Sequence, residues 1–381
     1  MEYKRLGDYI REVNVRNREL KVTKLFGLTI DKAFIPSVAN VIGTDLSNYK
    51  VIRREQFACS LMQVSRDGKM PVAMYEEDEA IMSPAYPMFE VIDKTALLPQ
   101  YLMMWFSRSE FDREASYYAV GGVRGSLTWE DFCNMQLPVP SIERQCEIVS
   151  EYETLTNRIH LNEQMIQHLE ATAQTLYRKM FVDGIDKENL PEGWRMGTLE
   201  DLGEIVGGAT PSTEVAEYWS DNDISWLSPA DLSKQGVKFI SKGAKDITSL
   251  GFKSCSTKML PEHSILFSSR APIGLMAINT CDVCTNQGFK SLVPNTKIGY
   301  PYAYYYLLSL RDKIAEENAG STFDEVSGKT MKEYEAIIPP KELTDEFTVL
   351  ATPIFKQQEL KEQENSKLTE LLSLLLAKIG Q

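Results

Sequence analysis

Hydrophobic and polar residues follow two kinds of pattern in this chain, and both kinds occur in each half. Short apolar runs bounded by turn residues, such as HSILFS, GLMAIN and KSLVP, are typical of β-strands. Longer stretches rich in aromatic residues, LLPQYLMMWFSRSEF and YPYAYYYLLSLRDKI, favour helices. Together these patterns predict an α+β fold, formed twice along the chain.

Three sequence blocks recur in the same order about 200 residues apart. KRLGDYI, which begins at Lys4, corresponds to GTLEDLGEI, which begins at Gly197. QFACSLMQVSRDGKMPVAM corresponds to PEHSILFSSRAPIGLMAI, and GGVRGSLTWEDFCNMQLPVP corresponds to AGSTFDEVSGKTMKEYEAIIPP. One weak match could arise by chance, but three in one order indicate two similar domains joined in tandem.

A long helical pattern follows the first domain. Apolar residues recur at steps of three and four from Val149 to Met180, which predicts a helix of about 40 residues and roughly 60 Å. Asn162 lies on the same apolar seam. There it would either fix the register of a helix pair or simply face solvent.

A second helical pattern closes the chain. It runs from Phe347 to Ile379 and includes Leu350 and Leu371 on its apolar seam. Pro353 should kink this helix or restart it, because proline lacks the N–H that the helix requires. Such long seams need a partner helix, so we expect the two long helices to pack against each other.

These patterns divide the chain into four segments. We expect a first globular domain in residues 1–140, a long helix in 141–183, a linker and second domain in 184–340, and a second long helix in 341–381. An antiparallel, coiled-coil-like pair of helices would then separate two similar domains with pseudo-twofold symmetry.

Composition places the chain among folded proteins but gives no sign of a strong nucleic-acid binder. The 381 residues are 43% hydrophobic and 25% charged, and the net charge is −13. No segment forms a basic block, so any contact with nucleic acid must rest on local patches or on a basic partner. No apolar run approaches the ~20 residues of a membrane span, and no secretory signal opens the chain. We therefore expect a cytoplasmic protein with no membrane association.

Patterns that carry out catalysis or bind metals are missing. The sequence has no phosphate-binding GxxxxGK[ST] loop, no GxSxG nucleophile motif and no glycine-rich methyltransferase loop. His160 and His168 are eight residues apart in the first long helix, where they should be solvated. Cys281 and Cys284 form a lone CxxC, which we interpret, like the other dispersed cysteines, as buried thiols. We expect no catalytic residues, no metal ligands and no cofactor.

Several segments together resemble the specificity subunit (HsdS) of type I restriction-modification systems. They are PEGWRMGTLEDLGEIVGGATPS, FSSRAPIGLMAI, TNQGFKSLVP, AGSTFDEVSGKTMKEYEAIIPP and LLSLLLAKIG. The resemblance covers nearly the whole chain, although the first half lacks the Trp and Gly-Gly opening and the NQGF motif. It implies a non-catalytic subunit that reads a bipartite double-stranded DNA target, with one half-site for each target recognition domain. It also implies that the helices act as a ruler and dock two modification (methyltransferase) subunits, which restriction (translocase and endonuclease) subunits join.

Candidate DNA contacts come from loops, because base-edge readers need long polar side chains on exposed turns. In the second domain the candidates are Thr210, Ser212, Ser269, Arg270, Gln287 and Lys290, and in the first domain they are Arg66, Lys69 and Arg124. Arginine is the usual reader of guanine, whereas we expect the two lysines to contact phosphate. The Ser-Arg pair recurs in domains that should read different bases, so a structural salt bridge is an equal alternative for Arg66 and Arg270.

Two further alternatives accompany this hypothesis. The tyrosines of the run 302–306 are better explained by a packed helix than by base stacking. The acidic balance of the chain also suits a protein-only scaffold, in which two binding domains on a helical ruler recruit other proteins.

Overall fold

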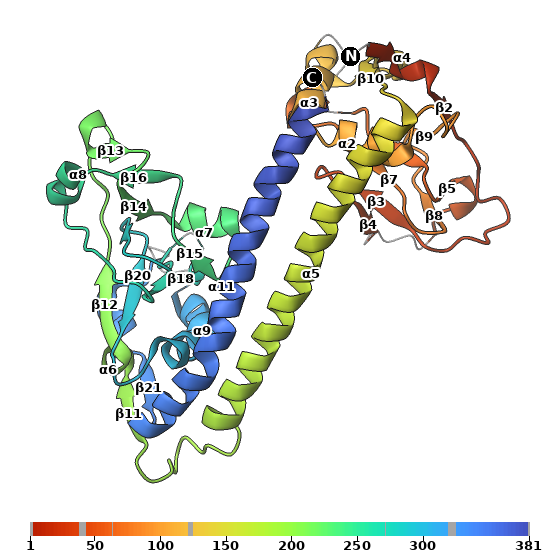
Figure 1. Cartoon of the computed structure of the whole chain (residues 1–381). Coiled ribbons are helices and arrows are strands. Elements are labelled where there is room, and N and C mark those ends of the chain that lie inside the picture. The colour runs from red at the N-terminus through yellow and green to blue at the C-terminus, as the bar shows by residue number, and fades with distance from the viewer. Residues whose placement is uncertain are drawn as a thin grey trace. The chain divides into compact units, whose positions relative to one another are not determined.

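The computed structural model describes residues 3–37, 43–62, 64–120, 125–270, 272–318 and 325–379. The chain divides into two compact units, one made of Met1–Ile159 with Lys367–Gln381 and the other of His160–Ser366. Both units combine helices with β-sheet, as Figure 1 shows, which confirms the expected α+β class.

The first unit is built on a four-stranded sheet of order β2-β9-β6-β7, in which every pair is antiparallel. These strands are Ile10–Glu12, Met88–Val91, Phe57–Cys59 and Val72–Met74. Three two-stranded pairs surround it: β1 (Tyr3–Arg5) with β10 (Gln136–Pro138), β3 (Phe26–Leu28) with β4 (Phe34–Pro36), and β5 (Lys50–Arg53) with β8 (Glu79–Met82). Its shorter helices are α1 (Val64–Asp67), α2 (Pro99–Phe106), α3 (Ser109–Ala119) and α4 (Trp129–Asn134).

Aromatic rings fill the core between this sheet and its helices. Phe57 and Phe89 stack with ring centroids 5.0 Å apart, and Phe106 and Phe132 pack against them from α2 and α4. All four side chains are fully buried. The stretch LLPQYLMMWFSRSEF forms α2 and the start of α3, so the prediction of helix is confirmed, and it places Phe106 and Phe111 in this core.

The second unit has a larger sheet of order β12-β20-β17-β18-β15. Its strands are Gly203–Gly207, Lys290–Pro294, Ile265–Phe267, Met276–Asn279 and Phe239–Ile240. A second sheet of order β13-β16-β14-β19 comprises Trp219–Ser220, Lys245–Ile247, Ile224–Leu227 and Cys284–Thr285, and β11 (Arg195–Thr198) pairs with β21 (Glu335–Ile338). The strand pairs are antiparallel in the first unit, whereas the second unit also has two parallel pairs, β14 with β19 and β15 with β18. The shorter helices are α6 (Leu199–Leu202), α7 (Pro229–Gln235), α8 (Ser249–Ser254), α9 (Tyr300–Asn318) and α10 (Gly328–Glu333).

The two units connect corresponding elements in the same order. A first strand leads through a short helix into the edge strand of the sheet, as β1 leads to β2 and β11 to β12. The next three strands then pair alike, since β2-β9-β6-β7 repeats the order of β12-β20-β17-β18. A capped helix and a return strand end each unit's globular part, with Thr128 and Ser327 as the side chains that cap α4 and α10. The three recurring sequence blocks thus fall on corresponding elements.

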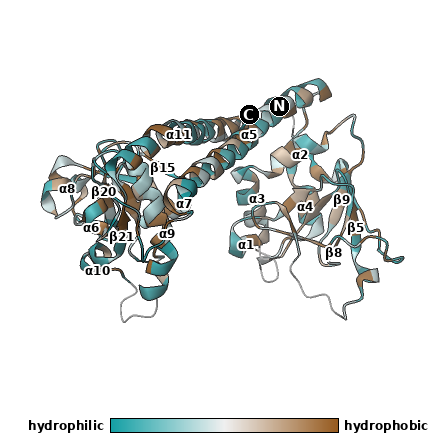
Figure 2. Cartoon of the chain, turned by 90° about the horizontal axis from the view of Figure 1, so that it is seen from below, coloured by the Kyte–Doolittle hydropathy of each residue, from teal (hydrophilic) through white to brown (hydrophobic). Residues whose placement is uncertain are grey.

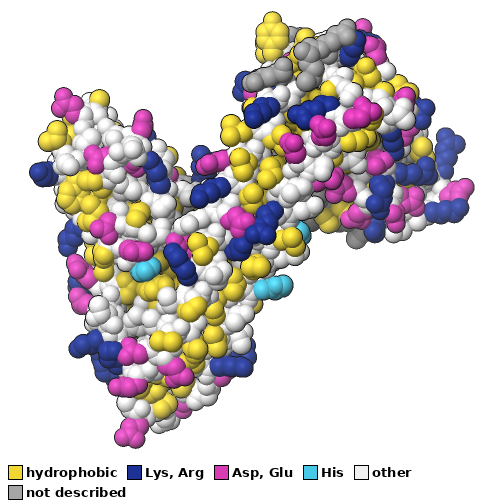
Figure 3. All heavy atoms as spheres, in the orientation of Figure 1, with side chains coloured by type: hydrophobic (Ala, Val, Ile, Leu, Met, Phe, Trp, Pro, Cys, Tyr) yellow, Lys and Arg dark blue, Asp and Glu magenta, His cyan; other side chains and the backbone are white. Residues whose placement is uncertain are grey.

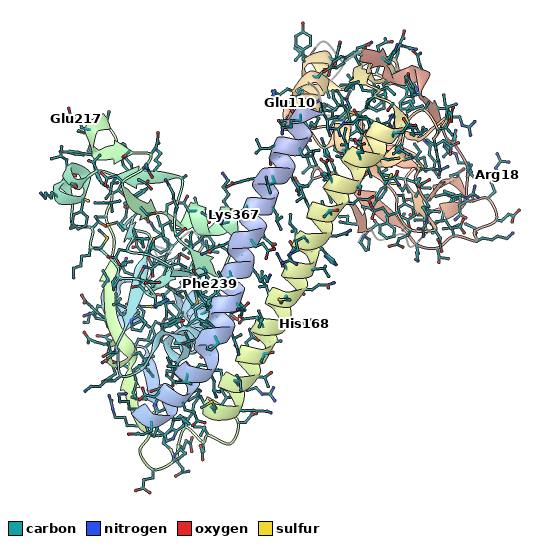
Figure 4. All side chains as sticks on the ribbon, in the orientation of Figure 1. Arg18, Glu110, His168, Glu217, Phe239 and Lys367 are labelled. Carbon is teal, nitrogen blue, oxygen red and sulfur yellow. The ribbon has the colours of Figure 1, made fainter. Side chains whose placement is uncertain are left out.

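Two long helices, α5 (Ile142–Phe181) and α11 (Lys341–Lys378), contribute residues to both units. Within the second unit Asn162 contacts Asn365 while Glu170 contacts Gln358, so residue numbers fall along α11 as they rise along α5 and the helices are antiparallel there. Hydrophilic and hydrophobic residues alternate along both (Figure 2). His160 and His168 are exposed on α5 as predicted, and His168 points away from the core in Figure 4.

The sequence patterns were wrong about two details of α11. The helix continues through Pro353, so the proline does not restart it. Leu350 and Leu371 are exposed rather than packed on the seam. The buried face carries Phe347, as predicted, together with Ala351 and Phe355, and then the polar residues Gln358 and Glu359.

Asn162 of α5 forms a polar contact with α11. Its side chain is 2% exposed, and its Nδ2 donates to Oδ1 of Asn365 at 2.9 Å. Of the two alternatives, the structure excludes a solvent-facing side chain. Because the buried Asn162 is satisfied by Asn365 in only one alignment, this pair fixes the register of α5 against α11.

A buried lysine, Lys238, joins the β15 edge of the sheet to both helices. Its Nζ lies 2.8 Å from Oε2 of Glu170 on α5 and 3.2 Å from Oε1 of Gln358 on α11. The same ammonium lies 3.6 Å from the ring centroid of Phe355 and 4.6 Å from that of Tyr304. Gln358 completes the set by donating to the Glu170 carboxylate at 2.9 Å. The cation is therefore held by charge, hydrogen bonds and aromatic faces together.

A second carboxylate holds the backbone at the same place. The N–H groups of Lys238 and Phe239 donate to the two oxygens of Glu362 on α11 at 3.1 and 2.9 Å. Phe239 itself, labelled in Figure 4, packs against Phe355 with ring centroids 5.9 Å apart. Two unpaired N–H groups at the sheet edge thus find their acceptors on a helix.

Burial governs the protonation of these groups. Desolvation lowers the pKa of Lys238 from 10.5 to about 8, although the Glu170 carboxylate opposes this change. Burial also acts to raise the pKa of Glu170, but the charge of Lys238 and the hydrogen bond from Gln358 outweigh it, so the pKa lies below its ordinary value. Lys238 and Glu170 therefore form an ion pair at neutral pH.

Removing one partner of this pair should cost much more than removing both. We expect Lys238→Met to lower the free energy of unfolding by about 3 kcal/mol, because it leaves the Glu170 carboxylate without its cation. The double variant K238M/E170Q should recover most of that loss, since the Glu170 charge is removed with its cation and Glu362 keeps its two backbone N–H donors. Urea unfolding of the wild type, both single variants and the double variant completes the cycle. Additive losses would show that the two side chains are not coupled.

Candidate nucleic-acid interface

The candidate residues of the second unit meet at the turn between β17 and β18. Ser268, fully buried, organises this turn: its Oγ donates to the carbonyl of Pro272 and accepts from the N–H of Leu275, both at 2.7 Å. Ser269 is also fully buried, and its N–H donates to the carbonyl of Gly288 at 2.8 Å. The backbone on either side of Arg270 is therefore fixed by buried hydrogen bonds.

An acidic residue lies between the two candidate cations. Arg270 forms an isolated β-bridge with Glu325, and the adjoining N–H of Val326 donates to the carbonyl of Ser269 at 2.9 Å. The Glu325 carboxylate lies 3.1 Å from Nζ of Lys290 and 3.9 Å from an Nη of Arg270. Lys290 is 15% exposed in its side chain, whereas Arg270 is 40% exposed. The arginine is thus the more accessible cation.

Thr210 and Gln287 form a second contact beside this group. The hydroxyl of Thr210 donates to Oε1 of Gln287, and the carbonyl of Gln287 lies 3.5 Å from Nζ of Lys290. The approach depends on Gly208, because a Cβ there would lie 2.2 Å from the carbonyl oxygens of Thr285 and Asn286. Glycine is required here for close packing of two backbones.

The structure thus brings together five of the six candidates of the second unit: Thr210, Ser269, Arg270, Gln287 and Lys290. Ser212 is exposed but lies elsewhere on the loop, where its carbonyl accepts from Nε1 of Trp219 at 3.1 Å. The buried Ser269 presents no hydroxyl at the surface, so its part is to support the loop. Sequence reasoning missed Glu325, although the repeated block AGSTFDEVSG had placed its segment opposite GGVRGSLTWE.

The candidates of the first unit are not brought together in the same way. Nε of Arg66, whose side chain is 65% exposed, pairs with Asp67 at 2.7 Å, whereas Nζ of Lys69 pairs with Asp31 at 2.9 Å. Arg124 lies outside the described residues.

The segment around Arg66 is a turn of helix, α1, and not a counterpart of the irregular loop at Arg270. The N–H of Gly68 donates to the carbonyl of Val64 at 3.0 Å, and Gly68 takes a φ of 66° that ends the turn. The expected equivalence of the two Ser-Arg segments is therefore wrong at the level of local structure.

Other chemistry adds little to this picture. Within the described ranges no group of three His, Cys, Asp or Glu could hold a metal ion. The cysteines were expected to be buried, but only Cys59 and Cys284 are, while Cys146 and Cys281 are exposed. The tyrosines of the run 302–306 are buried in α9, as predicted. No helix among the described residues is long and apolar enough to span a membrane.

Positive and negative side chains are interspersed on the face drawn in Figure 3. This distribution agrees with the net charge of −13 and with the pairing of each described candidate cation to a carboxylate. Phosphate attraction by this chain alone is therefore weak.

The second half of the chain has the clearest similarity to known proteins. Residues 191–370 match the type I restriction modification DNA specificity domain. The specificity subunit of the type I restriction enzyme MjaIX from Methanocaldococcus jannaschii is 38% identical over 169 residues, or 44% of this chain and 39% of that relative. The chain thus spans about two fifths of that protein's length in the match.

Two further proteins match over more of their length. The specificity subunit of the type I restriction enzyme HindI from Haemophilus influenzae is 24% identical over 76% of this chain and 79% of the relative. The crystal structure of the S subunit of a type I restriction-modification system from M. genitalium superposes with a TM-score of 0.65 at 13% identity, and covers all of this chain and 96% of the other. The latter similarity shows a shared fold.

Gly208 gives a direct test of how the candidate loop is held. We expect Gly208→Ala to lower the free energy of unfolding by about 1–3 kcal/mol, because the new Cβ overlaps two carbonyl oxygens. Gly207→Ala is the matched control, since its Cβ would meet nothing closer than 4.0 Å. Thermal unfolding of both variants checks the difference, and equal stabilities would mean that the close approach is not required.

Proposed function

We propose that the chain, whose residues 191–370 match the type I restriction modification DNA specificity domain, is a specificity subunit that reads a bipartite DNA target, with one half-site for each unit. The observation that carries this proposal is the repeated strand order, β2-β9-β6-β7 and β12-β20-β17-β18. Two units of one topology on one chain suit two half-sites on one duplex. Their loops differ in sequence and in structure, so the two half-sites should differ and the target should be asymmetric.

The proposed division into domains follows the sequence. Residues 1–140 and 184–340 would be the two target recognition domains, and residues 141–183 and 341–381 would be the helices that separate them with pseudo-twofold symmetry. Helices α5 and α11, which extend over much of these two segments, support a spacer of fixed length. The Asn162–Asn365 pair supports a single alignment of that spacer.

Recognition rather than catalysis would be the role of this chain, with methyl transfer and cleavage carried out by partners. Exposed apolar side chains on α5 and α11 support the docking of two modification subunits, with restriction subunits joining them: Leu161, Met165, Val349, Leu360, Leu371 and Leu374. Within the first unit a groove of about 470 Å³ is lined by Leu155, Leu371, Leu374 and Leu375. The partners would also supply cations for the DNA phosphates, because the described candidate cations of this chain are paired with carboxylates.

In the second unit, Arg270, Thr210 and Gln287 are the proposed contacts with bases, because they cluster at one turn and belong to the types that read base edges. In the first unit, Arg66, Lys69 and Arg124 stay candidates by their sequence alone. Ser212, exposed on the loop that follows Thr210, stays a candidate for contact with the backbone of the duplex.

Selection from a random duplex library tests the proposal. The chain, purified with its co-expressed modification subunits, should retain duplexes that share two short motifs at a fixed separation. The modification subunits alone serve as the control and should select no sequence. A complex that binds all duplexes equally, or none, would instead favour a protein-only scaffold.

The ruler part of the proposal predicts a change in spacing. Seven residues inserted into α5 after Ile159 and seven into α11 after Ser366 lengthen both helices by about 10.5 Å while keeping their register. We expect the gap between half-sites to grow by about three base pairs, with both motifs unchanged. Inserting the segment into α5 alone is the control, because it shifts one helix against the other. An unchanged gap in the double insertion would refute the ruler.

A further inference from the structure

We propose that Arg270 reads a guanine in the half-site of the second unit, and that Glu325 and Lys290 are positioning residues that aim it. The inference rests on the proposed function and specifies one base pair of the target. It also reassigns Lys290, for which the sequence suggested a contact with phosphate.

Lys290 has no donor left for a phosphate. An ammonium group carries three N–H donors, and three acceptors surround this one. They are Oε1 of Glu325 at 3.1 Å, Oγ of Ser269 at 3.4 Å and the carbonyl of Gln287 at 3.5 Å. With its side chain only 15% exposed, the lysine is a fixed internal cation beneath the loop.

Glu325 connects the fixed ammonium group of Lys290 to Arg270. One carboxylate oxygen faces Lys290 and the other faces an Nη of Arg270 at 3.9 Å. Without Lys290, a carboxylate on this surface would repel DNA. With it, the pair is neutral, and the net charge of the three groups is the single positive charge of Arg270.

Arg270 retains the geometry that guanine requires. Its guanidinium has five N–H donors, and among the described residues Glu325 is its only ionic partner. The contact uses one end of the group, so an edge of the fork stays available for the O6 and N7 acceptors of guanine. The bridge to Glu325 and the bond from Val326 to Ser269 also fix the backbone, which reduces the entropy lost on binding.

The first unit has no equivalent arrangement among its described candidates. Arg66 pairs with the adjacent Asp67 of its own helical turn, and Lys69 pairs with Asp31 at a separate place. The inference is therefore confined to the half-site of the second unit.

The test is library selection with the complex of this chain and its modification subunits, followed by binding measurements at several salt concentrations. Wild type should require a G·C pair at one position of one half-site. Arg270→Gln should lower that preference about 10- to 100-fold and leave the other positions unchanged. Glu325→Gln and Lys290→Gln should weaken preference at the same position, by about 3- to 10-fold, because each breaks the arrangement that aims Arg270.

Matched variants separate positioning from charge and from folding. Lys290→Arg keeps the cation and should keep the base preference if it folds. Lys329→Gln removes an exposed lysine of α10, whose side chain is 85% exposed, and should leave the preference unchanged. Glu325→Gln conserves the shape of a half-exposed side chain, so it tests the arrangement even if the lysine variants unfold.

Three outcomes would overturn the inference. A Lys290→Gln variant that loses affinity equally for all duplexes, with a salt slope smaller by about 1, would make Lys290 a phosphate contact. A Glu325→Gln effect at a different position from that of Arg270→Gln would mean that the carboxylate reads a cytosine itself. An Arg270→Gln variant with unchanged preference would exclude the arginine. If wild type selects no sequence, the proposed function fails before this inference is reached.

Discussion

The arrangement of the second unit depends on one buried cation, Lys238. A charge taken out of water is stable only where its partners surround it, and here Glu170, Gln358 and the ring of Phe355 define one position. Because these partners belong to both long helices and the lysine to the edge of the sheet, their contacts fix sheet and helices together within this unit. An apolar side chain of equal volume could fill the site at little cost, but it would not define a single alignment. The Asn162–Asn365 pair also defines a single alignment. Both polar contacts thus specify one geometry at positions where apolar side chains could be equally or more stabilising.

The loops that could read DNA are held by backbone contacts and by the buried side chain of Ser268. Buried hydrogen bonds of Ser268 and Ser269 and the close approach at Gly208 fix the turns that carry Thr210, Arg270 and Gln287. These hydrogen bonds do not involve the side chains of those three residues, so the side chains can change while the turns keep their structure. The first unit has the same strand order, yet it carries a helical turn where the second has an irregular loop. One frame can therefore present different reading surfaces.

Much of the fold could be predicted from the sequence because it rests on local patterns. The strands at HSILFS, GLMAIN and KSLVP, the aromatic helices and the repeated blocks all reflect periodicity or repetition in the chain itself. The errors came from contacts between distant residues. Leu350 and Leu371 looked buried, but α11 turns Gln358 and Glu359 inward, and Gln358 there meets Lys238, 120 residues away. Glu325 was missed because an isolated acid suggests no DNA contact, and its role depends on two cations that are distant in the sequence, Arg270 and Lys290.

Acidity and DNA recognition are compatible in this chain if reading and attraction are separate tasks. The described candidate cations are paired with carboxylates: Arg66 with Asp67, Lys69 with Asp31, and both Lys290 and Arg270 with Glu325. Such pairing removes most of the attraction for phosphate, which depends on net charge and gives no sequence information. The pairing does not prevent a side chain from pointing at a base edge. The match between its donors and the acceptors of that edge is what distinguishes one base from another. A chain built in this way would bind DNA weakly alone and would need a basic partner for affinity, so its recognition would be expressed only within a larger complex.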